Sequence, residues 1–347
     1  MPIHFFWHVK FFFGGVIMGL FNLYKKNSLI KKAYNLFNQG KYQEALKCYD
    51  KILKSDSEYI DAWYGKGVVL EKCGRYHESL EAYDKALELD PEYTDAWYGK
   101  GYTLTELERY QEALEAYDKT LELDPEYTDV WYNKGNTLIE LESCNEALEA
   151  YDKALELDPK YFGAWYNKGY TLANLERHQE ALECYVEALK LDPENSEAWY
   201  NKGGILTNMK DYTGALEAYD RALELDPKYL VAWHNRGYTL EKLERHQEAL
   251  EAYDKALEID YEDSKVWYNK GNTLKKLERY QEAIKNYNNA LKIDSKFTYA
   301  WIGKGNVFSE LEKYQKALKC YNNALDLDNH CEFALEAKKN VLKALKK

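Results

Sequence analysis

Apolar and small residues recur along most of the chain at helical spacing, in pairs of short stripes. One stripe begins at Trp97 and continues through Gly101 and Leu104, in steps of four and three that fit one face of a helix. After a polar break, a second stripe runs over residues 113–121. An Asp-Pro pair follows at 124–125, and the residue before a proline is driven out of the helical region. The pattern therefore predicts two helices joined by a short turn.

The same pair of stripes returns every 34 residues, and each period carries a tryptophan, a glycine four residues later and a tyrosine twenty residues later. The tryptophans are Trp63, Trp97, Trp131, Trp165, Trp199, Trp233, Trp267 and Trp301. The glycines are Gly67, Gly101, Gly135, Gly169, Gly203, Gly237, Gly271 and Gly305. The tyrosines are Tyr83, Tyr117, Tyr151, Tyr185, Tyr219, Tyr253, Tyr287 and Tyr321. A fixed period of this length indicates helical hairpins that share one continuous core when they stack.

This pattern leads to specific expectations about packing. Glycine inside a helix costs about 0.5–1 kcal/mol relative to alanine, so the repeated glycine needs a packing reason. We expect Gly101 and the small Ala113 to let the two helices of a hairpin cross closely, and the tyrosine column to form the core. Three residues are expected as N-caps: Thr94, Thr128 and Ser196. Three lysines are expected to pack their stems and extend the ammonium outward: Lys66, Lys100 and Lys134.

These residues resemble the tetratricopeptide-repeat (TPR) family, whose motif has Trp, Gly, a bulky apolar residue, Ala, an aromatic residue and Pro in this order. The resemblance covers residues 26–331 as nine repeats, numbered here 1 to 9. Repeat 1, residues 26–59, is degenerate, with Leu29 in place of Trp and Ala33 in place of Gly. The resemblance implies an all-α fold, a right-handed superhelical solenoid of about nine helix-turn-helix units.

The two ends of the chain depart from the repeat. Residues 332–347 are expected to form a capping helix with Leu335 and Leu342 on its inward face. Residues 1–25 are apolar, and three interpretations stay open: a membrane or interfacial anchor, a signal peptide, or an upstream stretch if translation starts at Met18. An anchor is weakened by Lys10, and a signal peptide lacks a small-residue cleavage site.

The TPR resemblance implies that a concave groove holds a partner's peptide. On a helical wheel, the residues two before and one, five, eight and nine after each tryptophan lie opposite the packing stripe; we call these the groove positions. The candidate binding residues at these positions are Tyr64, Tyr98, Tyr102, Tyr132, Asn136, Tyr166, Tyr170, Tyr200, Tyr238, Tyr268, Asn272 and Asn306. Tyrosine offers a flat contact with a polar tip, and asparagine can bond to a peptide backbone. The alternative is that the tyrosines only pack against neighbouring helices.

One family role is not expected. TPR co-chaperones that grip a C-terminal carboxylate resemble one another in a groove set of Lys, Asn and Arg. Asn136 and Asn167 match two members of this set, but Tyr132 stands at the place of the first Lys. Glu197 and Asn201 stand where Lys and Arg would be. A carboxylate would therefore meet no cation.

Charge narrows the class of partner. The formal net charge is −12, which disfavours a general nucleic-acid binder. Residues 60–263 carry −25 and residues 264–347 carry +8. The acidic part suits basic partners or weak head-to-tail self-association, and it is also typical of a solubilising surface. Nucleic-acid binding through 264–347 stays an unlikely alternative.

Catalytic chemistry is not visible in the sequence. The six cysteines show no CxxC spacing, and the seven histidines form no cluster of ligands. Cys48, Cys184 and Cys320 stand where other repeats have Ala, so we expect small buried side chains in a reducing compartment. We expect no enzyme activity, cofactor or metal, and a cytoplasmic scaffold that binds a protein or peptide. The alternative is a membrane-tethered assembly factor that uses residues 1–24.

Overall fold

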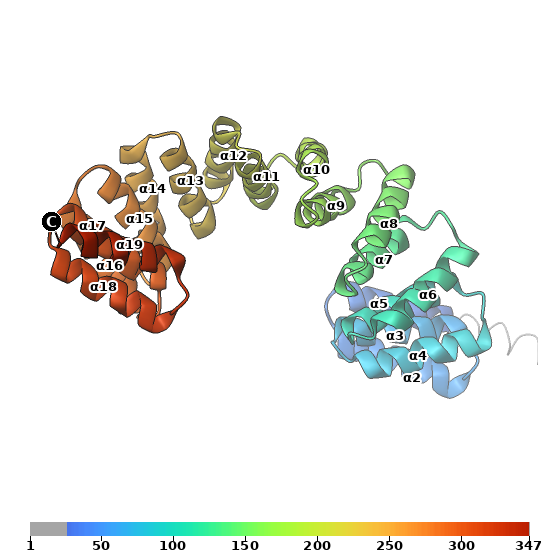
Figure 1. The fold of residues 1–347 in the computed structure, drawn as a ribbon. Coiled ribbons are helices and arrows are strands. Elements are labelled where there is room, and N and C mark those ends of the chain that lie inside the picture. The colour runs from blue at the N-terminus through green and yellow to red at the C-terminus, as the bar shows by residue number, and fades with distance from the viewer. Residues whose placement is uncertain (1–25, 347) are drawn as a thin grey trace, which may run out of the picture. The chain divides into compact units, whose positions relative to one another are not determined.

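Helices account for all the regular secondary structure of residues 26–346, the part of the chain that the computed structural model describes. The chain divides into two compact units, Met1–Lys168 and Gly169–Lys347, and the boundary falls inside one helix. Within each unit successive helices pack side by side (Figure 1). The all-α class is therefore confirmed, while the expectations for residues 1–25 lie outside the described residues.

In the first unit, a helix over residues 26–38 precedes α2. The helices that follow are α2 (Tyr42–Ser55), α3 (Ile60–Lys72), α4 (Tyr76–Leu89), α5 (Thr94–Glu106), α6 (Tyr110–Leu123), α7 (Thr128–Glu140), α8 (Cys144–Leu157) and the start of α9 (Phe162–Asn174). Repeat 2 consists of α3 and α4, repeat 3 of α5 and α6, and so on. The first helices of consecutive repeats also touch, as α3 with α5 and α5 with α7.

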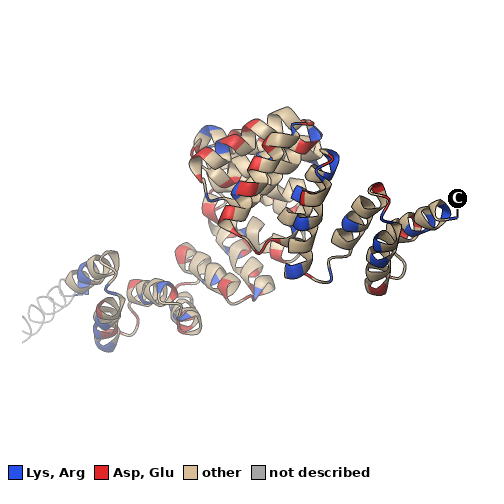
Figure 2. Cartoon of the chain, turned by 90° about the vertical axis from the view of Figure 1, so that its left-hand side faces the viewer, with Lys and Arg blue, Asp and Glu red and all other residues tan. Residues whose placement is uncertain are grey.

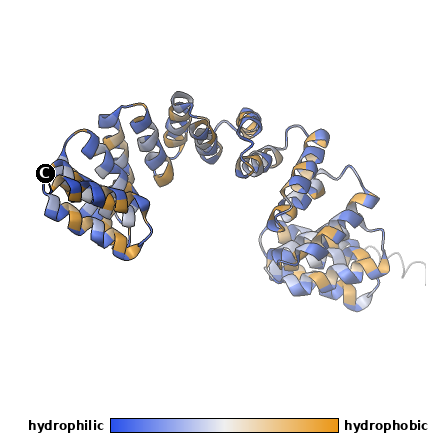
Figure 3. Ribbon diagram, viewed as in Figure 1, coloured by the Kyte–Doolittle hydropathy of each residue, from blue (hydrophilic) through white to orange (hydrophobic). Residues whose placement is uncertain are grey.

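The second unit continues the same alternation. Its helices are the rest of α9, α10 (His178–Leu191), α11 (Ser196–Asn208), α12 (Tyr212–Leu225), α13 (Leu230–Lys242), α14 (His246–Ile259), α15 (Ser264–Lys276), α16 (Tyr280–Ile293), α17 (Thr298–Glu310), α18 (Tyr314–Leu327) and α19 (Glu332–Ala344). First helices again touch one another from α11 to α19. Hydrophobic and hydrophilic residues alternate along these helices, as an amphipathic hairpin requires (Figure 3).

The tyrosine column forms the core of both units, as predicted. The eight tyrosines from Tyr83 to Tyr321 each have an exposed fraction of 1% or less. A Cβ atom at Gly101 would lie 2.7 Å from the ring of Tyr117. The expected close approach at this glycine is therefore confirmed: the nearest atoms belong to the Tyr117 ring, and Ala113 is buried in the same cluster as Tyr117.

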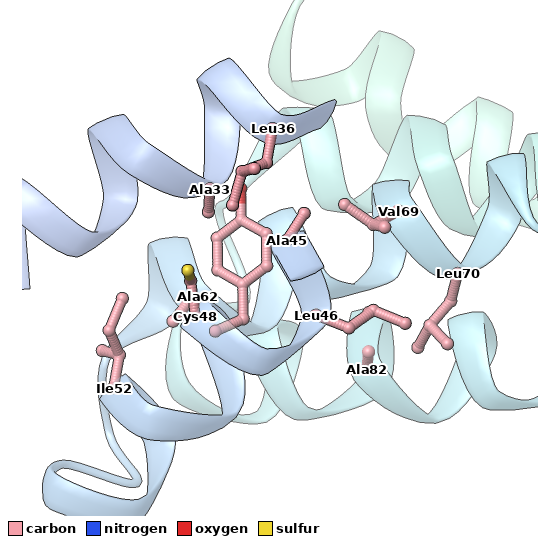
Figure 4. Close-up of a cluster of buried hydrophobic side chains, with 11 residues drawn as sticks. Ala33, Leu36, Ala45, Leu46, Cys48, Ile52, Ala62, Val69, Leu70 and Ala82 are labelled. Atoms are coloured by element: carbon pink, nitrogen blue, oxygen red, sulfur yellow. The ribbon is translucent and has the colours of Figure 1, made fainter. Parts of the chain in front are cut away.

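Small side chains complete the core between the rings. Between repeats 1 and 2, Ala33 of the first helix, Ala45 and Cys48 of α2 and Val69 of α3 gather in one buried cluster (Figure 4). The three cysteines at the alanine place, Cys48, Cys184 and Cys320, are 5%, 3% and 4% exposed. Their prediction as small buried side chains is confirmed.

The turn inside each repeat places one residue in the left-handed region. Gly40 and Gly74 hold this position in repeats 1 and 2, with φ of 72° and 70°. In later repeats a glutamate or lysine holds it, for example Glu142 with φ of 58°. A side chain costs about 1 kcal/mol in this conformation, so the packing on both sides of the turn must hold it there.

Tryptophan fixes the chain between one repeat and the next. The indole N–H of Trp97 donates to the carbonyl of Pro91 at 2.9 Å, and the indole of Trp131 donates to Pro125 at 3.0 Å. The second helices end at the predicted place, since α6 stops two residues before Pro125. The tryptophan is therefore a link to the preceding loop as well as a packing residue.

Two expectations about helix ends were wrong. Thr94 is the first residue of α5, and Tyr93 occupies the N-cap without a capping bond from its side chain. In α19, Leu335 and Leu342 are 47% and 42% exposed, while Ala334 and Val341 face inward. Leu335 and Leu342 stand at the places of Trp301 and Phe308, which the second helix α18 covers in repeat 9, and no second helix follows α19 in the described residues.

Candidate partner-binding face

In five repeats, the tyrosine directly after the tryptophan lies half-buried between two other aromatic rings. The Tyr98 ring centroid is 6.4 Å from that of Tyr117, the core tyrosine of its own repeat, and 5.1 Å from that of Tyr127, which directly precedes the first helix of the next repeat. The same arrangement holds for Tyr64, Tyr132, Tyr200 and Tyr268, where Phe297 replaces the last tyrosine. These candidate residues therefore connect consecutive repeats whether or not they also bind a partner.

An asparagine of the following repeat bonds to several of these tyrosines. Asn133 donates to the Tyr98 hydroxyl at 2.9 Å, and the matching pairs Asn167 with Tyr132 and Asn235 with Tyr200 are both at 3.2 Å. Burial, followed by the nearby Asp129 carboxylate, raises the pKa of Tyr98 to about 12. The hydroxyl therefore remains protonated under any physiological condition.

The residue before most of the first helices has one of two roles. Where it is aromatic, as Tyr127, the ring packs on the groove tyrosine and the helix has no side-chain cap. Where it is polar, the side chain caps the helix: Asn195 accepts from the amide of Ala198 at 2.9 Å, and Asp263 accepts from the amide of Val266 at 3.1 Å. Packing between repeats thus replaces helix capping at most of these places.

Tyrosines five residues after the tryptophan are more accessible. Tyr170 is 50% exposed and Tyr238 is 37% exposed. The Lys72 ammonium lies 5.7 Å from the centroid of the Tyr102 ring, and the Lys242 ammonium lies 4.9 Å from that of Tyr238. These rings are available for contact with a partner and already accept cations from the chain itself.

Where the residue five after the tryptophan is an asparagine, its amide oxygen accepts a hydrogen bond from a core tyrosine. The core tyrosines Tyr151, Tyr287 and Tyr321 donate to the oxygens of Asn136, Asn272 and Asn306 at 2.8, 2.7 and 2.9 Å. Asn167 also donates to the Asn136 oxygen, at 2.8 Å. The amide nitrogens of Asn136, Asn272 and Asn306 are the donors that remain for a ligand.

The twelve predicted residues fall into two sets, one in each unit. Tyr64, Tyr98, Tyr102, Tyr132, Asn136 and Tyr166 belong to the first unit, and Tyr170, Tyr200, Tyr238, Tyr268, Asn272 and Asn306 belong to the second. Tyr166 stacks on Phe162 of the same helix, with centroids 5.8 Å apart. Each set is considered by itself.

Acidic side chains accompany the rings of the first unit. Asp95 accepts from the Tyr127 hydroxyl at 3.3 Å, and Asp129 accepts from the Tyr161 hydroxyl at 2.7 Å. Glu71, also at a groove position, is largely buried and accepts from Tyr83 at 3.2 Å. Burial raises the pKa of Glu71 above its usual range, against the opposing effect of Lys72.

The groove positions of repeats 1 and 2 enclose a pocket of about 600 Å³, which we call the N-terminal pocket. Its aromatic lining consists of Tyr34, Phe37, Tyr49, Tyr59, Tyr64 and Tyr93. Asn27, Lys31 and Asp61 supply its polar groups. We did not predict the residues of repeat 1 from the sequence, although counting from Leu29 places Asn27, Tyr34 and Phe37 at groove positions.

The predicted lysines have partners on the opposite side of the helices. Lys100 pairs with Asp84 at 2.7 Å, and its ammonium lies 5.2 Å from the centroid of the Trp97 ring. Lys66 and Lys134 repeat this arrangement with Asp50 and Asp118. The stems pack as expected, but each ammonium is held by a carboxylate and a ring. Acidic and basic residues are interspersed along the helices (Figure 2).

Other chemistry was sought across residues 26–346. No group of three or more His, Cys, Asp or Glu side chains is placed there to hold a metal ion. Within the same range, no helix is both long and apolar enough to cross a membrane. The cysteines of this range are free thiols.

Comparison with known families identifies the architecture. Two models described as tetratricopeptide repeat match residues 70–128 and 171–229, and residues 231–260, 264–297 and 298–331. A third, described as TPR repeat, matches residues 33–74 and 135–176. These matches together span well over half of the chain. The chain belongs to the tetratricopeptide-repeat family. TPR arrays expose extended surfaces that generally serve as non-catalytic scaffolds for protein–protein interaction.

Solved TPR structures are similar to this one. The TPR protein YrrB, described as having an unusual peptide-binding site, is 30% identical over 54% of this chain and 97% of its own, with a TM-score of 0.48. One chain of the APC/C hetero-tetramer Cut9–Hcn1 is 16% identical over 91% of this chain and 76% of its own length, with a TM-score of 0.51. A TPR protein from Parabacteroides merdae is 17% identical over 72% and 98%, with a TM-score of 0.53. The last two likenesses show the fold alone. The comparison with curated proteins found no match.

Proposed function

We propose that this TPR protein is a non-catalytic scaffold that holds an extended segment of a partner protein along its groove positions. The observation that carries the proposal is the set of accessible rings and amide donors at one side of the first helices. Tyr102, Tyr170 and Tyr238 present their rings there, while Asn136 and its equivalents retain free amide nitrogens. Aromatic faces with nearby amide donors suit a peptide, whose backbone accepts hydrogen bonds.

The two tyrosine columns support this proposal differently. The column directly after the tryptophan, such as Tyr98, is engaged in packing between repeats. Removing it would disturb the fold and would not report on binding. The column five residues after the tryptophan is the better test, because Tyr170 and Tyr238 are exposed.

The test replaces Tyr102, Tyr170 and Tyr238 one at a time by the photo-crosslinking residue p-benzoylphenylalanine, in the full chain and in the native cells. We expect the same partner protein to be crosslinked from at least two of these places. A matched variant at Tyr261, which is 60% exposed but lies outside the groove positions, should not capture it. Equal capture from Tyr261 would place binding elsewhere and would refute the proposal.

Two alternatives concern the ends of the chain. A membrane tether through residues 1–24 lies outside the described residues. Nucleic-acid binding through 264–347 would need free cations; Lys270, Lys276 and Arg279 of this range are paired with carboxylates, and the net charge of the range is +8.

A further inference from the structure

The N-terminal pocket differs in chemistry from the groove positions that follow it. It is lined by three tyrosine rings that are not fully buried, those of Tyr34, Tyr59 and Tyr93, and Tyr34 is 60% exposed. A pocket of about 600 Å³ is large enough for one long side chain together with the backbone that carries it. The rings form the wall, and Asp61 is the acidic group that lines it.

At the position two residues after the tryptophan, repeats 2 and 3 have glycine where repeats 4 to 8 have asparagine. The place where Asn133 donates to Tyr98 holds Gly65 in repeat 2 and Gly99 in repeat 3. A Cβ atom at Gly65 would lie 2.5 Å from the ring of Tyr49, so this ring covers the glycine and extends into the pocket. Because Gly99 has no side chain, Tyr64 lacks the amide donor that Tyr98 has.

The groove positions of repeats 2 to 4 are strongly acidic, whereas the lining of the N-terminal pocket itself carries one acid, Asp61, and one base, Lys31. In repeats 2 to 4, the groove positions two before and eight and nine after the tryptophan carry six acids and one base. They are Asp61, Glu71, Asp95, Glu106, Asp129, Glu140 and the base Lys72. Like charges along one face attract cations and speed their association. Lys31 is the cation that lines the pocket, and it is exposed and opposes this attraction.

The rings of this region already hold ammonium groups of the chain. The Lys26 ammonium lies 5.5 Å from the centroid of the Tyr59 ring, and that of Lys72 lies 5.7 Å from the Tyr102 ring. Such contacts are attractive because the ring face is electron-rich. The planar guanidinium of arginine can both stack on a ring and pair with a carboxylate, which an ammonium does less well.

We propose that the N-terminal pocket binds an arginine side chain of a positively charged segment in the partner protein. The guanidinium lies against the tyrosine rings and pairs with Asp61, while the acids of repeats 3 and 4 attract the basic residues that flank the arginine. This inference rests on the proposed function and specifies the chemistry of the partner.

The first experiment measures binding of fluorescein-labelled Gly-Ser peptides to the full-length protein by fluorescence anisotropy. One peptide carries several arginines and the other carries citrulline, the neutral isostere, at the same places. We expect the arginine peptide to bind more tightly and its affinity to fall as salt is added. Asp61→Asn should weaken binding by about threefold or more, and Lys31→Ala should strengthen it. The matched control Glu81→Gln, an exposed acid of α4 outside the groove positions, should leave the affinity within twofold of the parent, on the order of measurement error.

Equal binding of the two peptides would overturn the proposal, as would equal losses from Asp61→Asn and Glu81→Gln. A second measurement separates this failure from failure of the groove as a whole. Random peptides displayed on phage are selected on the parent, on an Asp61→Asn variant and on a Tyr102→Ala variant. Enrichment of arginine-containing peptides that depends on Asp61 supports the pocket. If apolar or acidic peptides are enriched and their binding depends on Tyr102, the arginine pocket is refuted but peptide binding at the groove positions is supported. If the enrichment depends on neither Asp61 nor Tyr102, both proposals are refuted.

Discussion

Two adjacent glycines in α11 should respond in opposite ways to the same substitution. Gly203 is the repeated glycine, and a Cβ atom there would lie 2.7 Å from Cε1 and 2.8 Å from Cδ1 of the Tyr219 ring. At Gly204 a Cβ atom would meet nothing within 4 Å. Both residues are in the interior of one helix, so the intrinsic gain from replacing glycine by alanine is the same, about 0.5–1 kcal/mol.

The contact at Gly203 decides whether the alanine substitution there stabilises or destabilises the protein. Carbon atoms pack best at about 3.5–4.0 Å, so the ring would have to move by about 1 Å. Tyr219 is 1% exposed and has no open side to move into. Overpacking of this kind costs about 1–3 kcal/mol, which exceeds the helix gain. We expect Gly203→Ala to lose about 1 kcal/mol of unfolding free energy and Gly204→Ala to gain about 0.5–1 kcal/mol.

The assay is urea denaturation followed by circular dichroism, with amide hydrogen exchange in α11 and α12 as a local measurement. The local measurement is needed because long repeat arrays can depart from two-state unfolding. In a Tyr219→Leu background the ring is gone, so Gly203→Ala should no longer destabilise. The reasoning is refuted if Gly203→Ala is as stable as Gly204→Ala in the parent background.

Three further predictions follow from single residues. Glu142→Gly should stabilise by about 0.5–1 kcal/mol, because φ is 58° at this residue, whereas Glu149→Gly inside α8 should destabilise by a similar amount; urea midpoints of the pair check this. Tyr127→Asn should gain a helix cap worth about 1 kcal/mol but lose the ring contact with Tyr98, for a net loss that thermal unfolding measures; a net gain would contradict the priority given to packing. Burial lowers the pKa of His234 below its ordinary 6.5, so the unfolded chain binds the proton more readily and stability falls as the pH drops below 6.5. His234→Tyr should therefore lose less stability than the parent on acidification from about pH 7 to about pH 5.5, and an equal loss would contradict this.

Only part of the candidate site could be predicted from the sequence. Helical spacing placed Tyr64 and Tyr98 opposite the packing stripe, whereas in the structure each of them packs on the same buried cluster as the tryptophan before it. It could not separate Tyr98, which is held by two rings and an asparagine, from Tyr170, which is half exposed, because both occupy the same predicted face. That difference depends on contacts with the next repeat, which a wheel drawn for one helix does not contain.

The sequence by itself determined the repeating unit, its helices and its buried tyrosine column. These follow from periodicity, because each repeat meets the same neighbours and so must carry the same apolar residues. Only the tertiary structure decided what the special residues do. Gly101 leaves room for the Tyr117 ring, and the indole of Trp97 donates to the preceding loop. Tyr93 packs its ring on a neighbouring tyrosine and provides no side-chain cap to the helix. Each of these roles joins residues that lie apart in the chain, and their meeting depends on how one helix crosses the next.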